Sequence, residues 1–318
     1  MGYPPFFFGL RMTDILRNIF LTRHGDLRVV WRMMLFLLIA STVALAGGFL
    51  IQAVSVQSEA AVMILALGSV ALATLVMTRF VNRKPFTAVG LALHPGVVRD
   101  FSMGCLLGFL MMAGIFAVEY GLGFVSVAWR GLGPVDLLKI GGGSALLFAL
   151  SALFEELAFR GYLFQTLMQG ITFLPATLVF SVFFALAHTG NPNTTVLAII
   201  NVGLAGAWLS FAYMKTRSLW LPIGLHLSWN FSQTTVFSFP TSGIEFSGRS
   251  LLELSQSGPD WITGGKFGPE GGILATLALV LCIAHVLKSS MYRTPEGFVT
   301  LDSLEDILPV DGGKGGVA

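Results

Sequence analysis

Long runs of apolar residues, separated by short polar stretches, dominate the chain. A helix that crosses a bilayer needs about 20 consecutive, mostly apolar residues, and the pattern predicts eight of them. Their expected ranges are 29–52, 60–80, 101–127, 138–168, 174–189, 194–215, 218–238 and 271–289. The pattern therefore predicts an all-α, polytopic integral membrane protein.

The connections between these segments predict three regions. Residues 1–137 would hold the first three helices behind a cytoplasmic N-terminal segment, 138–238 a core of helices four to seven, and 239–318 a long loop, the eighth helix and a tail. The loop 239–270 is rich in Gly, Ser and Pro, which favours a mobile segment. The tail from Met291 is acidic and ends in glycines, which is typical of disorder.

Composition agrees with a membrane protein. The chain is 54% hydrophobic and 11% charged, whereas an ordinary soluble domain has about 25% charged residues. The net charge of +2, with no basic cluster among aromatic residues, gives no indication of nucleic-acid binding. Cys105 and Cys282 lie in separate apolar runs, form no CxxC metal motif, and are interpreted as packing residues.

The distribution of positive charge predicts the orientation. Cytoplasmic connections carry an excess of Lys and Arg. With the N-terminus in the cytoplasm, fourteen of the 19 Lys and Arg residues lie on that side and Arg160 lies within a predicted helix. The opposite side then holds four, namely Arg130, Lys139, Arg249 and Lys266. Eight spans return the C-terminus to the cytoplasm, so both termini are expected there.

Three of the predicted membrane helices contain ionisable or polar side chains within otherwise apolar sequence. An ionisable side chain at the bilayer centre costs from about 2.5 to more than 10 kcal/mol, so such residues usually face a cavity and mark function. The fourth helix holds Glu155, Glu156 and Arg160, the fifth ends with Phe184 and His188, and the seventh holds His226 and Asn230. These seven residues are the candidate site.

Helical spacing separates the two glutamates. Residues four apart share a helix face, whereas neighbours lie about 100° apart. Glu156 therefore pairs with Arg160, and Glu155 is left as a free carboxylate. If helices four and five form an antiparallel hairpin that turns near 171–172, Glu155 and His188 lie at the same level. His226 and Asn230 are also four residues apart, so they share one face of the seventh helix.

The three clusters together resemble a known family. They stand in order as FEELAFR at 154–160, FxxxH ending at 188, and HxxxN starting at 226. This combination resembles the CPBP (Abi) family of intramembrane glutamic proteases, which includes the CAAX prenyl endopeptidases, and it covers about residues 138–238. The resemblance implies water activation by Glu155 and His188 and oxyanion binding by His226 and Asn230. The remaining three candidates are expected to give structural support: Glu156 and Arg160 as a buried pair, and Phe184 by packing.

The implied activity is hydrolysis of a peptide bond in a membrane-associated protein or peptide, prenylated CAAX proteins among them, with no metal and no other cofactor. Peptide hydrolysis needs a base for water and hydrogen-bond donors for the developing oxyanion, and the candidate residues supply both. The partners expected are this substrate and the lipid bilayer, and the expected location is the plasma membrane of a prokaryote.

Two alternatives stay open. Glu155, His188 and His226 could bind zinc as a His₂Glu set in a metalloprotease, although the HExxH motif is missing. The protein could also be a non-catalytic membrane scaffold or a transporter, in which the polar residues relay protons or join helices.

Overall fold

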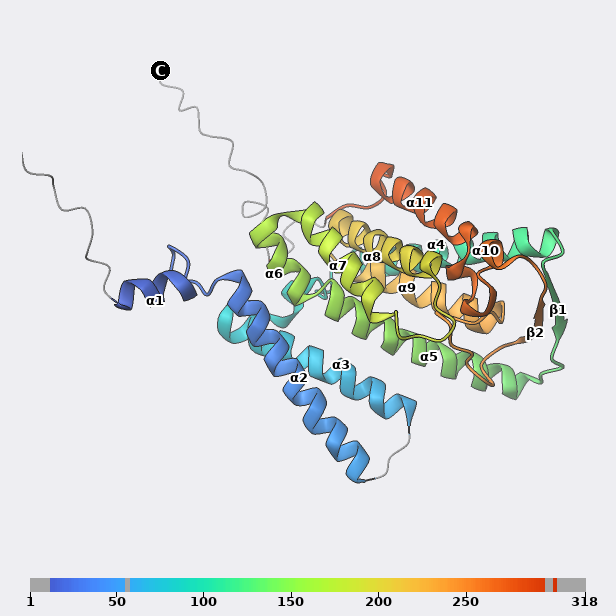
Figure 1. Ribbon diagram of the computed structural model, residues 1–318, viewed down its shortest axis with the longest axis horizontal. Coiled ribbons are helices and arrows are strands. Elements are labelled where there is room, and N and C mark those ends of the chain that lie inside the picture. The colour runs from blue at the N-terminus through green and yellow to red at the C-terminus, as the bar shows by residue number, and fades with distance from the viewer. Residues whose placement is uncertain (1–11, 55–57, 295–299, 302–318) are drawn as a thin grey trace, which may run out of the picture.

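The computed structural model describes residues 12–54, 58–294 and 300–301 (Figure 1). The α-helices are α1 (Met12–Phe20), α2 (Val29–Ala53), α3 (Glu59–Val76), α4 (Val97–Gly121), α5 (Pro134–Phe159), α6 (Tyr162–Ile171), α7 (Phe173–Ala187), α8 (Val196–Thr216), α9 (Trp220–Phe231), α10 (Asp260–Thr263) and α11 (Ile273–Lys288). The π-helices η1 (Met77–Val81) and η3 (Ser232–Val236) extend α3 and α9, and the 3-10 turns are η2 (Phe86–Val89), η4 (Gly265–Phe267) and η5 (Pro269–Gly271). The strands β1 (Val125–Trp129) and β2 (Leu252–Gln256) form one antiparallel pair.

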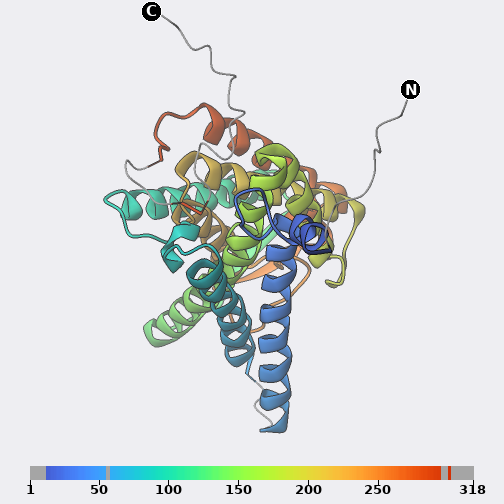
Figure 2. The same ribbon diagram turned by 90° about the vertical axis from the view of Figure 1, so that its left-hand side faces the viewer.

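The helical class predicted from the apolar pattern is confirmed. In the described residues, five helical segments are long and apolar enough to cross a bilayer: 29–53, 59–81, 97–121, 134–171 and 196–216. The apolar helices α7 and α11 are shorter. Each of the eight predicted segments contains a helix, and the number of eight crossings stays a prediction. Helices α2 and α3 form a hairpin that leans away from the others (Figure 2).

Two predicted helix boundaries are wrong. The fourth helix does not run unbroken to residue 168, because α5 ends at Phe159 and α6 begins at Tyr162. The break lies at Gly161, where an added Cβ atom would lie 2.2 Å from the Leu157 carbonyl oxygen. The third helix ends at Gly121 rather than continuing to residue 127, since the chain enters β1 and pairs with β2.

Glycines bring α4 and α9 into close backbone contact. A Cβ atom on Gly104 or Gly108 would lie 2.4 or 2.6 Å from carbonyl oxygens of α9, and one on Gly224 would lie 2.3 Å from the Phe101 carbonyl oxygen. Small residues four apart are the usual means by which membrane helices approach each other. This packing buries the first two turns of α9, through His226.

Contacts between connections sort them into two ends of the molecule. At one end, β1 pairs with β2, and the Arg249 guanidinium lies 3.2 Å from the Glu59 carboxylate. At the other end, the Lys84 ammonium donates hydrogen bonds of 2.8 Å to the Thr300 and Leu301 carbonyl oxygens. Every one of these contacts joins connections predicted to lie on the same side of the membrane.

The expected loop 239–270 is not irregular throughout, and its mobility stays a prediction. The segment 239–272 contains β2, α10, η4 and η5. Its glycines permit close backbone approaches: a Cβ atom on Gly268 would lie 2.1 Å from the Pro240 carbonyl oxygen, and Gly268 has a φ of +95°. The predicted disorder of the tail lies mostly outside the described residues.

The orientation can be tested by cysteine labelling in a variant without Cys105 and Cys282. Thr87→Cys, exposed on η2, should react with an impermeant reagent after the membrane is opened. Glu253→Cys, exposed on β2, should react in intact cells, because the positive-inside rule places this end outside the cytoplasm. Labelling of Thr87→Cys alone in intact cells would refute the orientation.

Candidate active site

His226 lies between two glutamates. Its Nδ1 is 2.8 Å from Glu156 Oε1, and its Nε2 is 3.7 Å from Glu155 Oε2. The side chain comes from α9 and both carboxylates come from α5, so the contact depends on the packing of these helices. His226 is 7% exposed. The imidazole ring is therefore fixed by Glu156 on one side and presents its second nitrogen toward Glu155.

The expected pair of Glu156 and Arg160 is present, and both residues make further contacts that the helical spacing does not indicate. Arg160 Nη1 donates to Glu156 Oε1 over 3.0 Å, and Nη2 donates to the Gly206 carbonyl oxygen of α8 over 2.9 Å. The guanidinium also lies 4.7 Å from the centre of the Phe184 ring on α7. Since Glu156 also contacts His226, this fully buried pair joins α5 to α7, α8 and α9.

Phe184 packs beneath both histidines. Its ring centre is 4.8 Å from that of His188 and 6.2 Å from that of His226. The Arg160 guanidinium lies near the same ring, so Phe184 contacts the buried cation as well as both histidines. This position agrees with structural support.

Glu155 is only partly bonded. Ser151 Oγ donates to its Oε1 over 3.1 Å, and its Oε2 has no hydrogen-bond partner within the described part of the chain. The side chain is 18% exposed. Glu155 thus keeps one buried acceptor oxygen without a hydrogen bond, beside His226 Nε2. As the helical spacing predicted, Glu155 is not the partner of Arg160.

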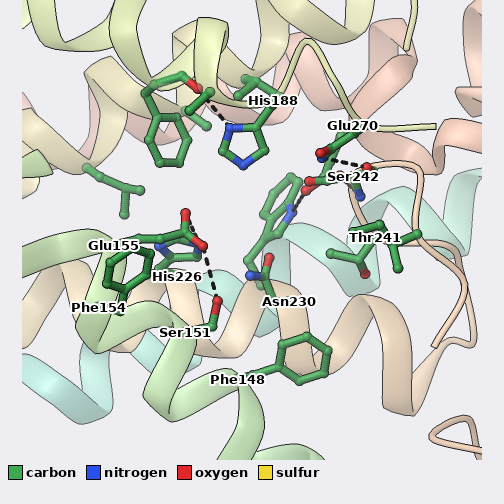
Figure 3. Close-up of a pocket in the computed structure, with 18 of the residues that line it drawn as sticks. Phe148, Ser151, Phe154, Glu155, His188, His226, Asn230, Thr241, Ser242 and Glu270 are labelled. Atoms are coloured by element: carbon green, nitrogen blue, oxygen red, sulfur yellow. Dashed lines mark hydrogen bonds and ion pairs between the residues drawn. The ribbon is translucent and has the colours of Figure 1, made fainter. Parts of the chain in front are cut away.

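His188 caps the end of α7 with a defined tautomer. Its Nδ1 lies 2.8 Å from the Phe184 carbonyl oxygen. A carbonyl oxygen accepts but does not donate, so Nδ1 carries the proton and Nε2 of the neutral ring is an acceptor. The ring points into the space above Glu155 (Figure 3), where Nε2 can take a proton.

One cavity of about 840 Å³ collects the candidates (Figure 3). Glu155, His188, His226 and Asn230 all line it. Its walls are largely apolar, with Phe148, Phe154, Trp208, Leu209 and Leu279 among them. The agreement in level expected for Glu155 and His188 is consistent with this shared cavity, and the short distance from Glu155 to His226 was not expected.

Several polar residues of the cavity were missed. Glu270, Ser242 and Thr241 line it from the segment 239–272, and Glu59 lines it from the start of α3. The sequence signal was weak because these residues lie in connections, where polar residues are ordinary. The signal that could have indicated Glu270 is a carboxylate within the glycine-rich sequence GPEGG at 268–272.

The ligand set of the zinc alternative is not assembled here. Zinc needs nitrogen and oxygen ligands about 2.0–2.2 Å from one point. Among residues 12–54, 58–294 and 300–301, no group of three His, Cys, Asp or Glu residues is arranged to hold a metal ion. His226 instead directs both nitrogens at carboxylates of α5.

Comparison with known families gives one match. Residues 142–232 match the family model described as type II CAAX prenyl endopeptidase Rce1-like. The matched segment runs from α5 to the first residue of η3 and contains all seven candidate residues. The comparisons with curated proteins and with solved structures give no match. The resemblance predicted from the three motifs is thus confirmed over residues 142–232, which are similar to this family.

Proposed function

We propose that the protein is an intramembrane endopeptidase in which Glu155 and His188 activate water and His226 and Asn230 bind the oxyanion. The observation that carries the proposal is the meeting of these four side chains, from three helices, in one largely apolar cavity. A carboxylate with an unbonded oxygen and a histidine with an acceptor nitrogen supply the base. The family match supports a CAAX-type endopeptidase in general.

The reaction follows from these groups. Glu155, with His188, removes a proton from water, and the hydroxide adds to the carbonyl carbon of the scissile peptide bond. His226 lies between two carboxylates and acts here as the imidazolium, in which both ring nitrogens carry a proton. The carbonyl oxygen becomes negative and accepts hydrogen bonds from His226 Nε2–H and the Asn230 amide. When the C–N bond breaks, the leaving nitrogen takes the proton, and a carboxylate and an amine are released. In a cavity with little water, such donors contribute about 3–4 kcal/mol each.

The substrate is a membrane-associated protein or peptide. Ser58, Asn191 and Ile244 line the cavity at one end of the molecule, and Ser58 and Ile244 are exposed there. If the N-terminus lies in the cytoplasm of a prokaryote, this end lies outside it. A peptide entering from the bilayer or from that side fits this arrangement, and a prenylated CAAX substrate requires passage from the cytoplasmic side. The labelling experiment above shows which side of the membrane this end faces. It therefore distinguishes the two substrate classes.

Glu155→Gln should retain the fold and lose nearly all turnover, because an amide keeps the shape and cannot accept the proton. General-base catalysis contributes on the order of 10²–10⁴-fold. Mass spectrometry of membrane peptides from cells with wild-type protein or the variant would reveal the products that depend on Glu155. Purified proteins would then be assayed with a quenched farnesylated CAAX peptide, its unprenylated form and any peptide so found.

The matched control is Glu253→Gln, which alters an exposed carboxylate on β2 and should leave turnover unchanged. Identical membrane peptides from cells with wild-type protein and with Glu155→Gln would exclude the proposed base.

Glu156→Gln should have a different effect. It leaves both Arg160 and His226 without their carboxylate, and removing one partner of a buried pair costs about 3–5 kcal/mol. The melting temperature should fall, and turnover per folded molecule should fall too, because His226 loses its orientation. Thermal unfolding in one detergent, with Glu155→Gln alongside, measures both effects. A Glu156→Gln protein with the wild-type melting temperature would show that the pair is not structural.

Hydrolysis should not depend on zinc. The described residues offer no assembled ligand set, so activity should survive exhaustive chelation, and the purified protein should contain far less than one metal ion per molecule. Activity that is lost on chelation and restored by zinc alone would favour the metalloprotease alternative.

A further inference from the structure

A third carboxylate faces the cavity and differs from Glu155 in being fully bonded. Glu270, in η5, is 9% exposed. Its Oε1 accepts a hydrogen bond from Trp229 Nε1 over 3.2 Å. Its Oε2 accepts from the backbone N–H of Ser242 and from Ser242 Oγ, the latter over 2.9 Å (Figure 3). Three donors from two segments thus converge on one carboxylate.

The Trp229 bond reaches the helix that holds the proposed oxyanion donors. Trp229 directly precedes Asn230 and follows His226 by three residues on α9. Its indole is buried and packs against Trp208 of α8, with ring centres 5.9 Å apart. The bond from Trp229 to Glu270 therefore fixes the part of α9 that presents Asn230 to the cavity.

The Ser242 bonds reach the segment that follows His188. The Ser242 carbonyl oxygen accepts from Asn191 Nδ2 over 2.9 Å, and the Asn191 backbone N–H donates to the His188 carbonyl oxygen over 3.1 Å. At Gly243, with a φ of +81°, an added Cβ atom would lie 1.9 Å from the Pro192 carbonyl oxygen. The chain at 242–243 therefore lies directly against the residues after His188.

The backbone at Glu270 is itself anchored to two helices. Asn201 of α8 donates from Nδ2 to the Glu270 and Gly272 carbonyl oxygens, both over 2.8 Å. Thr276 of α11 donates to Asn201 Oδ1 over 2.6 Å. These bonds agree with the structural role that a polar residue inside an apolar helix usually has. The carboxylate of Glu270 is thus held at a fixed position.

We infer that Glu270 is a positioning residue that sets the distance between His188 on one side of the cavity and His226 and Asn230 on the other. This inference rests on the proposed function. A carboxylate suits the position because it only accepts hydrogen bonds, and all of its partners here can donate. A glutamine has one acceptor oxygen and one NH₂ donor, so its NH₂ group would face a donor such as the indole N–H, which would be left unbonded.

Glu270→Gln should lower kcat by about 10- to 100-fold and leave KM nearly unchanged, because a small displacement of catalytic groups costs rate more than binding. Trp229→Phe removes one of the donors and should have a smaller effect of the same kind. Glu253→Gln, in the same segment and exposed, is the control. In the Asn230→Ala background, Glu270→Gln should lower kcat much less, since groups that act as a unit are not additive. Additive effects would overturn the inference.

Hydrogen exchange of the full-length protein in nanodiscs gives a test that does not depend on activity. Glu270→Gln should accelerate exchange of amides in 188–194 and 239–246 and leave α2 and α3 unchanged. Unchanged exchange in 188–194 would overturn the inference even if kcat falls. If Glu270→Gln does not fold, Trp229→Phe and Ser242→Ala give the same two measurements. Full activity of Glu155→Gln would instead refute the proposed function, and exchange would still report on Glu270.

Discussion

The candidate site depends on the contacts that the buried Glu156 carboxylate makes with Arg160 and with His226. Two charges taken out of water cost several kcal/mol each unless they are paired and their remaining hydrogen bonds are made. Arg160 meets part of this requirement through Glu156 and the Gly206 carbonyl oxygen, while Arg160 Nε and Glu156 Oε2 have no hydrogen-bond partner in the described part of the chain. The pair therefore holds α8 and α5 together, and through His226 it also determines where α9 presents its imidazole. Loss of the carboxylate would affect stability and the site at once.

The fold provides the surroundings that this pair needs. α9 lies against α4 at glycine contacts, which brings its first two turns into the centre of the molecule. The helix break at Gly161 ends α5 directly after Arg160, whose backbone N–H still bonds to the Glu156 carbonyl oxygen over 2.8 Å. The segment 239–272 lines the cavity as well. Hydrogen bonds through Asn201 and Thr276 connect this segment to α8 and α11. The Rce1-like match spans α5 to α9, and the segment that completes the cavity lies beyond it.

Local patterns predicted what depends on local structure. Apolar runs located the helices, and the spacing of four residues predicted the Glu156–Arg160 pair and the free Glu155. The contact between Glu156 and His226 joins residues 70 positions apart, and no periodicity indicates such a contact. Glycine in 239–270 predicted mobility, and in the folded chain it permits close backbone contacts there. Glu270 was missed because its hydrogen-bond partners come from segments that are distant in the sequence. Only the folded chain brings these segments together.

The central claim is that the peptide bond is hydrolysed between the Glu155–His188 pair and the His226–Asn230 pair. The most direct test is an experimental structure of Glu155→Gln with an uncleaved peptide bound. The account predicts a scissile carbonyl oxygen at about 2.7–3.1 Å from His226 Nε2 and the Asn230 amide, with its carbon facing residue 155 and His188. A peptide whose scissile bond lies elsewhere, or whose carbonyl oxygen binds a metal ion, would contradict it.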